Sequence, residues 1–354
     1  MPVWSWMVAF WHRIFCSMDL ECCLLKAYIR DIAYYLPEKT EENPAGRLRK
    51  KTGIKCRHIC TDEEVASDLA VCAAERLFSQ GISRDEVEYL IFCTQSPDYY
   101  LPTTACILQH RLGLKTGIGA FDYNLGCSGY VYGLGMAKGL IESGQVKNVL
   151  LLTAETYSKY INPEDNSVRP LFGDAATATL LTAVDTDMEG IYGLTYGTDG
   201  SGADNLIVPV GGARQPFSKS SEHLMCDEYG NKRSNYNLYM DGSSIMNFSL
   251  DKVPAILENI LAKAACSRNN IDYFVFHQAN KFMLDFLQDK CALSGYPYWN
   301  DVKEYGNTVS NSIPIALADL LASKKSSELQ RVVIIGFGVG LSWAGGIIDL
   351  SFAQ

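Results

Sequence analysis

The sequence lacks an excess of positive charge. Its 354 residues include 31 Lys and Arg against 40 Asp and Glu, which gives a formal net charge of −9. General nucleic-acid binding requires a basic surface that neutralises phosphates, so this balance argues against it. One dense basic cluster could bind the phosphates of a small molecule or the acidic face of a partner, or it could be a solvated surface. Its members are Arg47, Arg49, Lys50, Lys51, Lys55 and Arg57.

Long apolar runs are also missing. The apolar stretch at residues 3–11 is shorter than the roughly twenty residues that a membrane-spanning helix needs. Residues 1–17 have neither a basic n-region nor a cleavage-like tail. We interpret them as a misassigned start upstream of Met18 or as an aromatic peptide packed on the surface, with a weak membrane-surface contact as a further alternative. At 47% hydrophobic residues, the chain can bury one large core or two fused ones.

Cysteines with paired metal-ligand spacing are absent. The chain has 12 cysteines, and none of their spacings forms a Cys-x-x-Cys pair. Cys56, His58 and Cys60 would alternate between the two faces of an extended segment, so they could not easily converge on one ion. We therefore expect neither a metal site nor a cofactor. Many free cysteines without a secretion signal indicate a reducing, cytoplasmic environment.

Cys127 lies in a local context that gives it a chemical role. Residues 117–131, GIGAFDYNLGCSGYV, form an apolar run that ends in a small-residue turn and continues as a predicted helix to Gln145. The thiol would face the N-terminus of that helix, where the dipole and the unpaired amides favour the thiolate. Because a thiolate attacks acyl carbonyls, this position predicts a nucleophile. Burial in an apolar environment would instead make the thiol inert.

Two polar residues in the second part of the chain complement this cysteine. His277 follows the apolar run 271–276 and opens the sequence HQAN. Folds place catalytic side chains at the ends of buried strands, although a histidine there can also be a satisfied core residue. Asn307 lies in YGNT at 305–308, before a predicted helix at 312–323, and Gly-Asn alone is only a turn signal. The functional interpretation rests on the three residues together.

An internal repeat supports their combination. Residues 83–92, SRDEVEYLIF, match residues 267–276, SRNNIDYFVF, and VLLL at 149–152 corresponds to VVII at 332–335. Two pairs of similar segments at nearly the same spacing predict duplicated halves. The alternative is a chance likeness between buried strands. Cys127 would belong to the first half, and His277 and Asn307 to the second, with a small-molecule cleft between them.

The predicted boundaries follow from this division. We expect an N-terminal half at 18–185 that carries the nucleophilic cysteine and a C-terminal half at 186–354 that carries the histidine and asparagine. Residues 211–237 are polar and rich in Gly and Ser. They form too long a connection for a minimal loop, which predicts a substrate-entrance loop.

These motifs together resemble the ketoacyl-acyl-carrier-protein synthase III family of thiolase-fold condensing enzymes. The resemblance rests on the cysteine turn, HQAN at 277–280, GNT at 306–308 and FGD at 172–174, and runs from about Ile29 to the C-terminus. It implies an α/β fold of the thiolase type, with five αβαβα layers made of two duplicated halves. It also implies a homodimer and a Cys-His-Asn site at the bottom of a tunnel for a phosphopantetheine arm.

The reaction implied by the resemblance has two steps. Cys127 takes an acyl group from acyl-coenzyme A or an acyl-acyl-carrier protein, and His277 and Asn307 then stabilise the enolate formed when malonyl-acyl-carrier protein loses carbon dioxide. The carbanion attacks the acyl-cysteine, and the backbone amides of Cys127 and Val339 would bind the resulting oxyanion. Fatty-acid initiation and specialised lipid or polyketide synthesis are all compatible with this chemistry. The alternatives are acyl transfer from Cys127 to an alcohol or amine, with His277 as base, or a non-catalytic partner of a synthase.

The resemblance also implies substrate contacts. Arg47 and Lys51 belong to the basic cluster, and Arg47 stands where many members carry a tryptophan that stacks on the adenine of coenzyme A. Lys281 is adjacent to Phe282, which occupies an often basic position of the carrier-protein-binding helix. Leu101 occupies the place of a residue that reaches across the dimer to the partner's acyl pocket.

Overall fold

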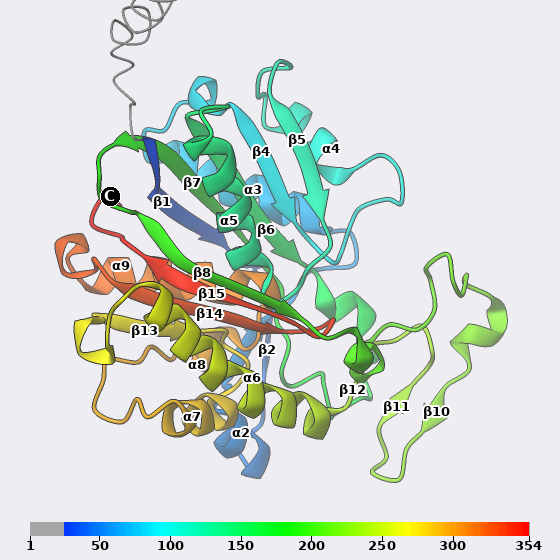
Figure 1. Ribbon diagram of the computed structural model, residues 1–354. Coiled ribbons are helices and arrows are strands. Elements are labelled where there is room, and N and C mark those ends of the chain that lie inside the picture. The colour runs from blue at the N-terminus through cyan, green and yellow to red at the C-terminus, as the bar shows by residue number, and fades with distance from the viewer. Residues whose placement is uncertain (1–24, 354) are drawn as a thin grey trace, which may run out of the picture.

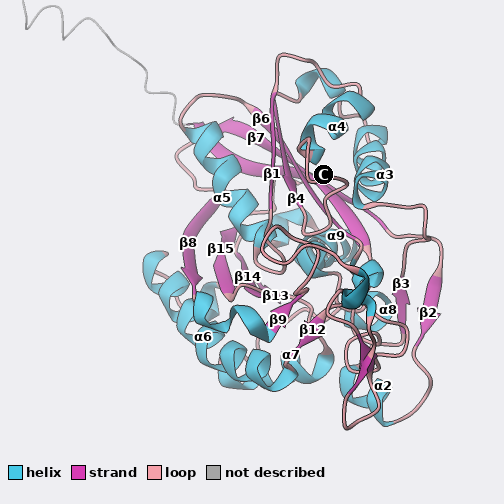
Figure 2. Ribbon diagram, turned by 90° about the vertical axis from the view of Figure 1, so that its right-hand side faces the viewer, coloured by secondary structure: helices cyan, strands magenta, loops and turns pink. Residues whose placement is uncertain are grey.

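The computed structural model describes residues 25–353, so the predicted extension at 1–17 lies outside the described residues. A five-stranded and a four-stranded sheet enclose a central layer of helices, and further helices cover their outer faces (Figure 1). Figure 2 shows α6 and α7 on the opposite side of the molecule from α3 and α4. This five-layer α/β arrangement confirms the predicted fold class.

The first sheet has the strand order β1-β7-β6-β4-β5. Its central strands β4 and β6 are parallel, and their apolar runs are completely buried because helices cover both faces. The sheet consists of β1 (Leu25–Tyr35), β4 (Tyr89–Cys93), β5 (Gly119–Tyr123), β6 (Asn148–Glu155) and β7 (Ala175–Asp185).

The second sheet has the order β13-β14-β15-β8. It consists of β8 (Ile191–Thr198), β13 (Tyr273–Phe276), β14 (Val332–Gly338) and β15 (Ser342–Ile348). The two pairs of similar segments form equivalent strand pairs. Tyr89 pairs in register with Val149 in the first sheet, and Tyr273 pairs with Val332 in the second. Both pairs are parallel, so the repeated sequences occupy the same structural position in each sheet.

Helices α5 (Gly129–Glu142) and α9 (Ser312–Ser323) form the central layer, and each contacts both sheets. Their apolar residues Leu134 and Leu317 are fully buried in one cluster with Ile91 of the first sheet and Ile334 of the second. Burying a leucine side chain contributes roughly 1.5–3 kcal/mol, so this cluster holds the two sheets together strongly. Helix α9 has the predicted bounds, whereas α5 ends at Glu142 instead of Gln145.

The outer helices each cover one sheet. Helices α3 (Ala66–Ser79) and α4 (Thr104–Arg111) pack on the first sheet, and α6 (Gly242–Lys263) packs on the second with α7 (Lys281–Lys290) beside it. The short helices are α2 (Arg47–Thr52) and α8 (Val302–Tyr305). The remaining strands form two-stranded pairs: β2 (Thr40–Glu42) with β3 (Cys56–His58), β9 (Leu206–Ile207) with β12 (Tyr239–Met240), and β10 (Met225–Cys226) with β11 (Lys232–Arg233).

The segment at 211–237, predicted as a loop, contains the β10–β11 hairpin, which projects from the body of the molecule (Figure 1). Its turn is closed by Asp227, whose carboxylate accepts hydrogen bonds from the backbone N–H groups of Tyr229 and Asn231. The segment therefore contains a short hairpin, which the ion pair between Arg233 and Asp165 ties to the rest of the molecule.

Candidate active site

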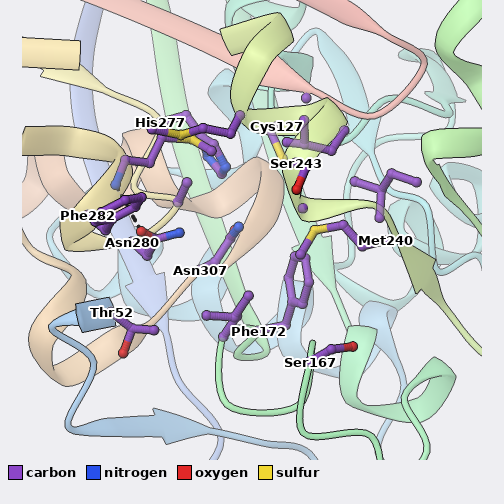
Figure 3. Close-up of a pocket in the computed structure, with 18 of the residues that line it drawn as sticks. Thr52, Cys127, Ser167, Phe172, Met240, Ser243, His277, Asn280, Phe282 and Asn307 are labelled. Atoms are coloured by element: carbon purple, nitrogen blue, oxygen red, sulfur yellow. Dashed lines mark hydrogen bonds between the residues drawn. The ribbon is translucent and has the colours of Figure 1, made fainter. Parts of the chain in front are cut away.

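Cys127, His277 and Asn307 come from three separate loops and line one cavity of about 540 Å³. Cys127 lies between β5 and α5, His277 follows β13, and Asn307 precedes the 3-10 helix Val309–Asn311. In Figure 3 Asn307 lies below His277 and Cys127, with its amide nitrogen turned toward them. The structure thus brings together the three residues that the sequence singled out.

Cys127 is held against the turn that connects β14 and β15. It is 5% exposed, and a Cβ at Gly338 would lie 2.9 Å from its sulfur. Only glycine therefore lets the end of β14 approach the thiol so closely. The backbone N–H groups of Cys127 and Val339 lie close enough to the sulfur to lower its pKa. This is the arrangement that would also receive an oxyanion on a group bonded to the sulfur.

The electrostatic environment of Cys127 differs from the expectation. The helix N-terminus predicted a lowered pKa, but burial raises the pKa of the Cys127 thiol to about 12, and the charge of Glu155 acts in the same direction. The N–H groups of Cys127 and Val339 offset only part of this rise. The residue is therefore a thiol at neutral pH, and its attack on an acyl carbonyl requires a base.

His277 is fixed at the end of β13 by its backbone and its ring. Its backbone N–H donates to the carbonyl of Ile335 at 2.8 Å, and the ring nitrogen Nδ1 lies 2.7 Å from the hydroxyl oxygen of Ser312. Burial lowers the pKa of His277 to about 3, so the imidazole is neutral at physiological pH. Because the Ser312 hydroxyl can accept or donate, Nε2 of His277 can serve as an acceptor or as a donor.

Asn307 is positioned by the FGD sequence. Its backbone N–H donates to the carbonyl of Leu171 at 2.8 Å, and its carbonyl accepts from the N–H of Gly173 at 2.9 Å. Its side-chain Oδ1 accepts from the N–H of Val309 at 2.9 Å. This bond fixes the orientation of the amide and directs its NH₂ group toward the cavity. Asp174 anchors the same loop by accepting hydrogen bonds from the N–H groups of Cys60 and Ser158.

Glu155 is a buried carboxyl group near Cys127 that the sequence interpretation missed. It is fully buried at the end of β6 and accepts hydrogen bonds from the Ser310 hydroxyl at 2.8 Å and the Gln95 N–H at 3.0 Å. Burial raises its pKa to about 8. The available signal was a single acidic residue that ends the apolar run of β6, where charged side chains are seldom buried without partners.

Replacing Glu155 with glutamine should remove a pH dependence of stability. The pKa is raised from 4.5 to about 8, so above pH 4.5 the folded protein keeps a proton that the unfolded chain loses. The wild-type free energy of unfolding should therefore fall relative to that of Glu155→Gln as the pH rises to about 8, by at most about 1.4 kcal/mol per pH unit. Urea unfolding at pH 5, 6.5 and 8 measures this difference. The exposed Glu228→Gln variant should behave like wild type, and parallel curves for wild type and Glu155→Gln would contradict the prediction.

The predicted substrate-binding residues occupy different places. Lys51 lines the cavity, and its ammonium group lies 4.5 Å from the centre of the Phe282 ring. Arg47 is exposed at the start of α2, and Lys281 is exposed and forms an ion pair with Asp285. Leu101 is 86% exposed. Of these residues, the structure places only Lys51 in the lining of the cavity with Cys127.

Two kinds of functional feature are absent from residues 25–353. No cluster of histidine, cysteine and carboxylate side chains with metal-binding geometry occurs among these described residues. None of the helices in the same part of the chain is long and apolar enough to span a bilayer.

Comparisons with known proteins agree with this geometry. Residues 121–200 match the family model of 3-oxoacyl-[acyl-carrier-protein (ACP)] synthase III, and residues 261–350 match its C-terminal model. A beta-ketoacyl-[acyl-carrier-protein] synthase III of Clostridium perfringens is 35% identical over 86% of this chain and 90% of its own. A putative 3-oxoacyl-[acyl-carrier-protein] synthase 3 of Campylobacter jejuni is also 35% identical, over 86% of this chain and 84% of its own.

Solved structures are similar over nearly the whole chain. A 3-oxoacyl-(acyl-carrier-protein) synthase III structure superposes with a TM-score of 0.89 at 48% identity, covering 92% of this chain and 99% of that one. A synthase of Burkholderia xenovorans superposes with a TM-score of 0.82 at 37% identity, covering 91% of this chain and 93% of its own. With its buried cysteine, neutral histidine and oriented asparagine, the chain belongs to the 3-oxoacyl-[acyl-carrier-protein] synthase III family of acyltransferase-class condensing enzymes.

Proposed function

We propose that the protein transfers an acyl group from a thioester to Cys127 and condenses it with malonyl-acyl-carrier protein. The observation that carries this proposal is the single cavity that Cys127, His277 and Asn307 line together. A thiol nucleophile, a neutral imidazole and an oriented amide are the groups that the two steps require. No other titratable group needs to enter the cavity for the chemistry to proceed.

In the first step, Cys127 is acylated. Its thiol has a pKa of about 12, so Nε2 of the neutral His277 takes the proton as the sulfur attacks the thioester carbonyl. For this step Nδ1–H of His277 donates to the Ser312 hydroxyl. The new carbon–sulfur bond to Cys127 replaces the bond to the leaving thiolate, which receives the proton from His277. The N–H groups of Cys127 and Val339 stabilise the tetrahedral oxyanion between these events.

In the second step, the malonyl thioester loses carbon dioxide. Between the two steps, His277 exchanges its Nδ1 proton with water for a proton on Nε2, and the Ser312 hydroxyl then donates to Nδ1. Nε2–H and the Asn307 amide therefore both donate to the thioester oxygen, on which the enolate charge develops. The electrons of the broken carbon–carbon bond form the nucleophile that attacks the acyl-cysteine. The tetrahedral adduct then releases the sulfur of Cys127, which regains a proton, and the 3-oxoacyl product leaves.

We further infer the partner and the setting of the reaction. An acyl-carrier protein would present the malonyl group, with the exposed cations Arg47 and Lys281 and the cavity residue Lys51 attracting its acidic surface. A homodimer would place Leu101 of each subunit against its partner, since residues 99–101 form a continuous run of exposed large apolar side chains. We place this chemistry in the cytoplasm, where acyl-carrier proteins and free thiols coexist.

Intact-protein mass spectrometry tests the proposal. Wild type and Cys127→Ala would be incubated with acyl-coenzyme A and acyl-acyl-carrier-protein donors, and then with malonyl-acyl-carrier protein. We expect an acyl adduct that Cys127→Ala lacks and that the malonyl donor discharges as a 3-oxoacyl product. An adduct that only alcohols or amines discharge would replace condensation with acyl transfer. The absence of an adduct from every donor would overturn the role of Cys127.

A further inference from the structure

A second cavity, of about 780 Å³, lies next to the Cys127 loop. Leu206 lines both cavities, and Val339, whose N–H lies close to the Cys127 sulfur, lines the second one. A Cβ at Gly126 would lie 2.6 Å from Cγ1 of Val339 and 2.5 Å from Oε1 of Gln95, which also lines the second cavity. The residue before the nucleophile therefore touches the wall of this cavity.

The reaction explains why two cavities are needed, and this step rests on the proposed function. While Cys127 carries the acyl group, the cavity that contains His277 and Asn307 must receive the malonyl thioester. The acyl chain must therefore leave that cavity free. The second cavity is the adjoining space, so its lining contacts the acyl group.

The wall of the second cavity nearest Cys127 is polar. The Tyr157 hydroxyl donates to Oε1 of Gln95, Nε2 of Gln95 donates to Oδ1 of Asn124 at 2.9 Å, and the Tyr160 hydroxyl donates to the Gln95 carbonyl at 3.2 Å. We call these four residues the Gln95 network. Tyr157 is 4% exposed, so its hydroxyl is largely shielded from bulk water. Gln95 and Tyr160 are half-buried and Asn124 is exposed, so Tyr157 is the buried member of the Gln95 network.

The Gln95 network keeps free hydrogen-bonding capacity. The two tyrosine oxygens retain lone pairs after donating. The Asn124 NH₂ group is exposed and can bond water, so the shielded part of this capacity belongs to the Tyr157 hydroxyl. A hydrocarbon chain against this wall would leave such groups without partners, which is unfavourable, whereas a hydroxyl group can both donate and accept. The apolar side chains of Val208 and Leu238, farther along the lining, suit the carbon skeleton.

We propose that the acyl group loaded onto Cys127 carries a hydroxyl group close to the thioester, and that the Gln95 network binds this hydroxyl in the second cavity. Gln95 and Tyr157 act as specificity-determining residues. They distinguish a hydroxylated acyl chain from an alkyl chain of the same shape, because a site built to bond a hydroxyl leaves its own polar groups unpaired with the alkyl analogue.

Two donors of matched shape test the proposal. The acylation rate of Cys127 would be measured by mass spectrometry with 3-hydroxybutyryl and 3-methylbutyryl thioesters, each linked to coenzyme A and to acyl-carrier protein. Wild type should prefer the hydroxylated donor by at least about tenfold in kcat/KM. Tyr157→Phe, which removes one oxygen atom, should lower this ratio toward one, mainly by slowing the hydroxylated donor. The exposed Tyr229→Phe should keep the wild-type ratio.

Each outcome has a separate meaning for the two proposals. If wild type uses 3-methylbutyryl as well as 3-hydroxybutyryl and malonyl-acyl-carrier protein discharges both adducts, the proposed function holds and the hydroxyl specificity is wrong. An unchanged ratio in Tyr157→Phe also overturns the role of the network. If neither donor acylates Cys127 while longer alkyl donors do, the substrate class is wrong. If no donor forms an adduct, both proposals fail.

Discussion

Asn307→Ala should form the acyl-enzyme at nearly the wild-type rate but lose condensation by about 100- to 1,000-fold, the usual effect of removing one donor to a developing oxyanion. The Asn307 amide contacts the malonyl thioester only in the second step of the proposed mechanism. Its backbone bonds to Leu171 and Gly173 do not depend on the side chain, so the loop should keep its place. Burst kinetics of acylation and the rate of product formation from malonyl-acyl-carrier protein measure the two steps separately.

The control for this variant is Asn269→Ala. Asn269 is exposed after α6, accepts a hydrogen bond from the Tyr296 hydroxyl at 2.7 Å and does not line the cavity of Cys127. It should leave both rates unchanged. Equal losses of acylation and condensation in Asn307→Ala would show that the amide does not act selectively in the second step.

Gly336→Ala should damage both stability and activity. A Cβ there would lie 2.5 Å from the carbonyl oxygen of Cys127 and 2.8 Å from Cα of Ser128, and neither backbone atom can rotate away. Overpacking of this kind lowers the free energy of unfolding by about 1–3 kcal/mol. A shift of about 1 Å in the nucleophile lowers kcat/KM by about 100-fold. Denaturant unfolding and the acylation rate of Cys127 measure the two effects.

Gly139→Ala provides the matched control, because it makes the same chemical change on the exposed side of α5. No atom lies within 4 Å of a Cβ at this position. Alanine is the better helix former, so the variant should gain up to about 1 kcal/mol of stability and keep wild-type acylation. If Gly336→Ala were as stable and active as Gly139→Ala, the contact between β14 and the Cys127 loop would not be what fixes the nucleophile.

Local patterns were enough to predict much of the fold and to single out three residues that line one cavity. The run 312–323 became α9 with the predicted bounds because its apolar residues face both sheets, and His277 follows a buried strand as expected. The repeated sequences at 83–92 and 267–276 contain the equivalent strands β4 and β13. Both strands are buried and parallel to a neighbour, and such strands need similar apolar residues. These features depend on periodicity and on neighbours along the chain.

The features that could not be predicted depend on contacts between distant segments. The high pKa of Cys127 arises from burial beneath the β14–β15 turn, more than 200 positions later in the sequence, and from Glu155. The Gln95 network joins residues from three loops of the first sheet, and no local pattern brings Gln95, Asn124 and Tyr157 together. A helix N-terminus alone predicted a lowered thiol pKa, whereas desolvation dominates in the folded protein.

The burial of three titratable groups has a consequence for the release of carbon dioxide. At neutral pH the Cys127 thiol, the His277 imidazole and most of the Glu155 carboxyl are uncharged, because their pKa values are about 12, about 3 and about 8. In the proposed mechanism, a malonyl carboxylate that approaches these uncharged groups loses part of its water shell, and Lys51, the cation in the cavity lining, is itself exposed to solvent. This loss would raise the free energy of the bound malonyl group, whereas the enolate of the proposed mechanism would accept hydrogen bonds from His277 and Asn307. The same burial that raises the pKa of the Cys127 thiol would therefore favour decarboxylation, because the carbon dioxide that is released is uncharged.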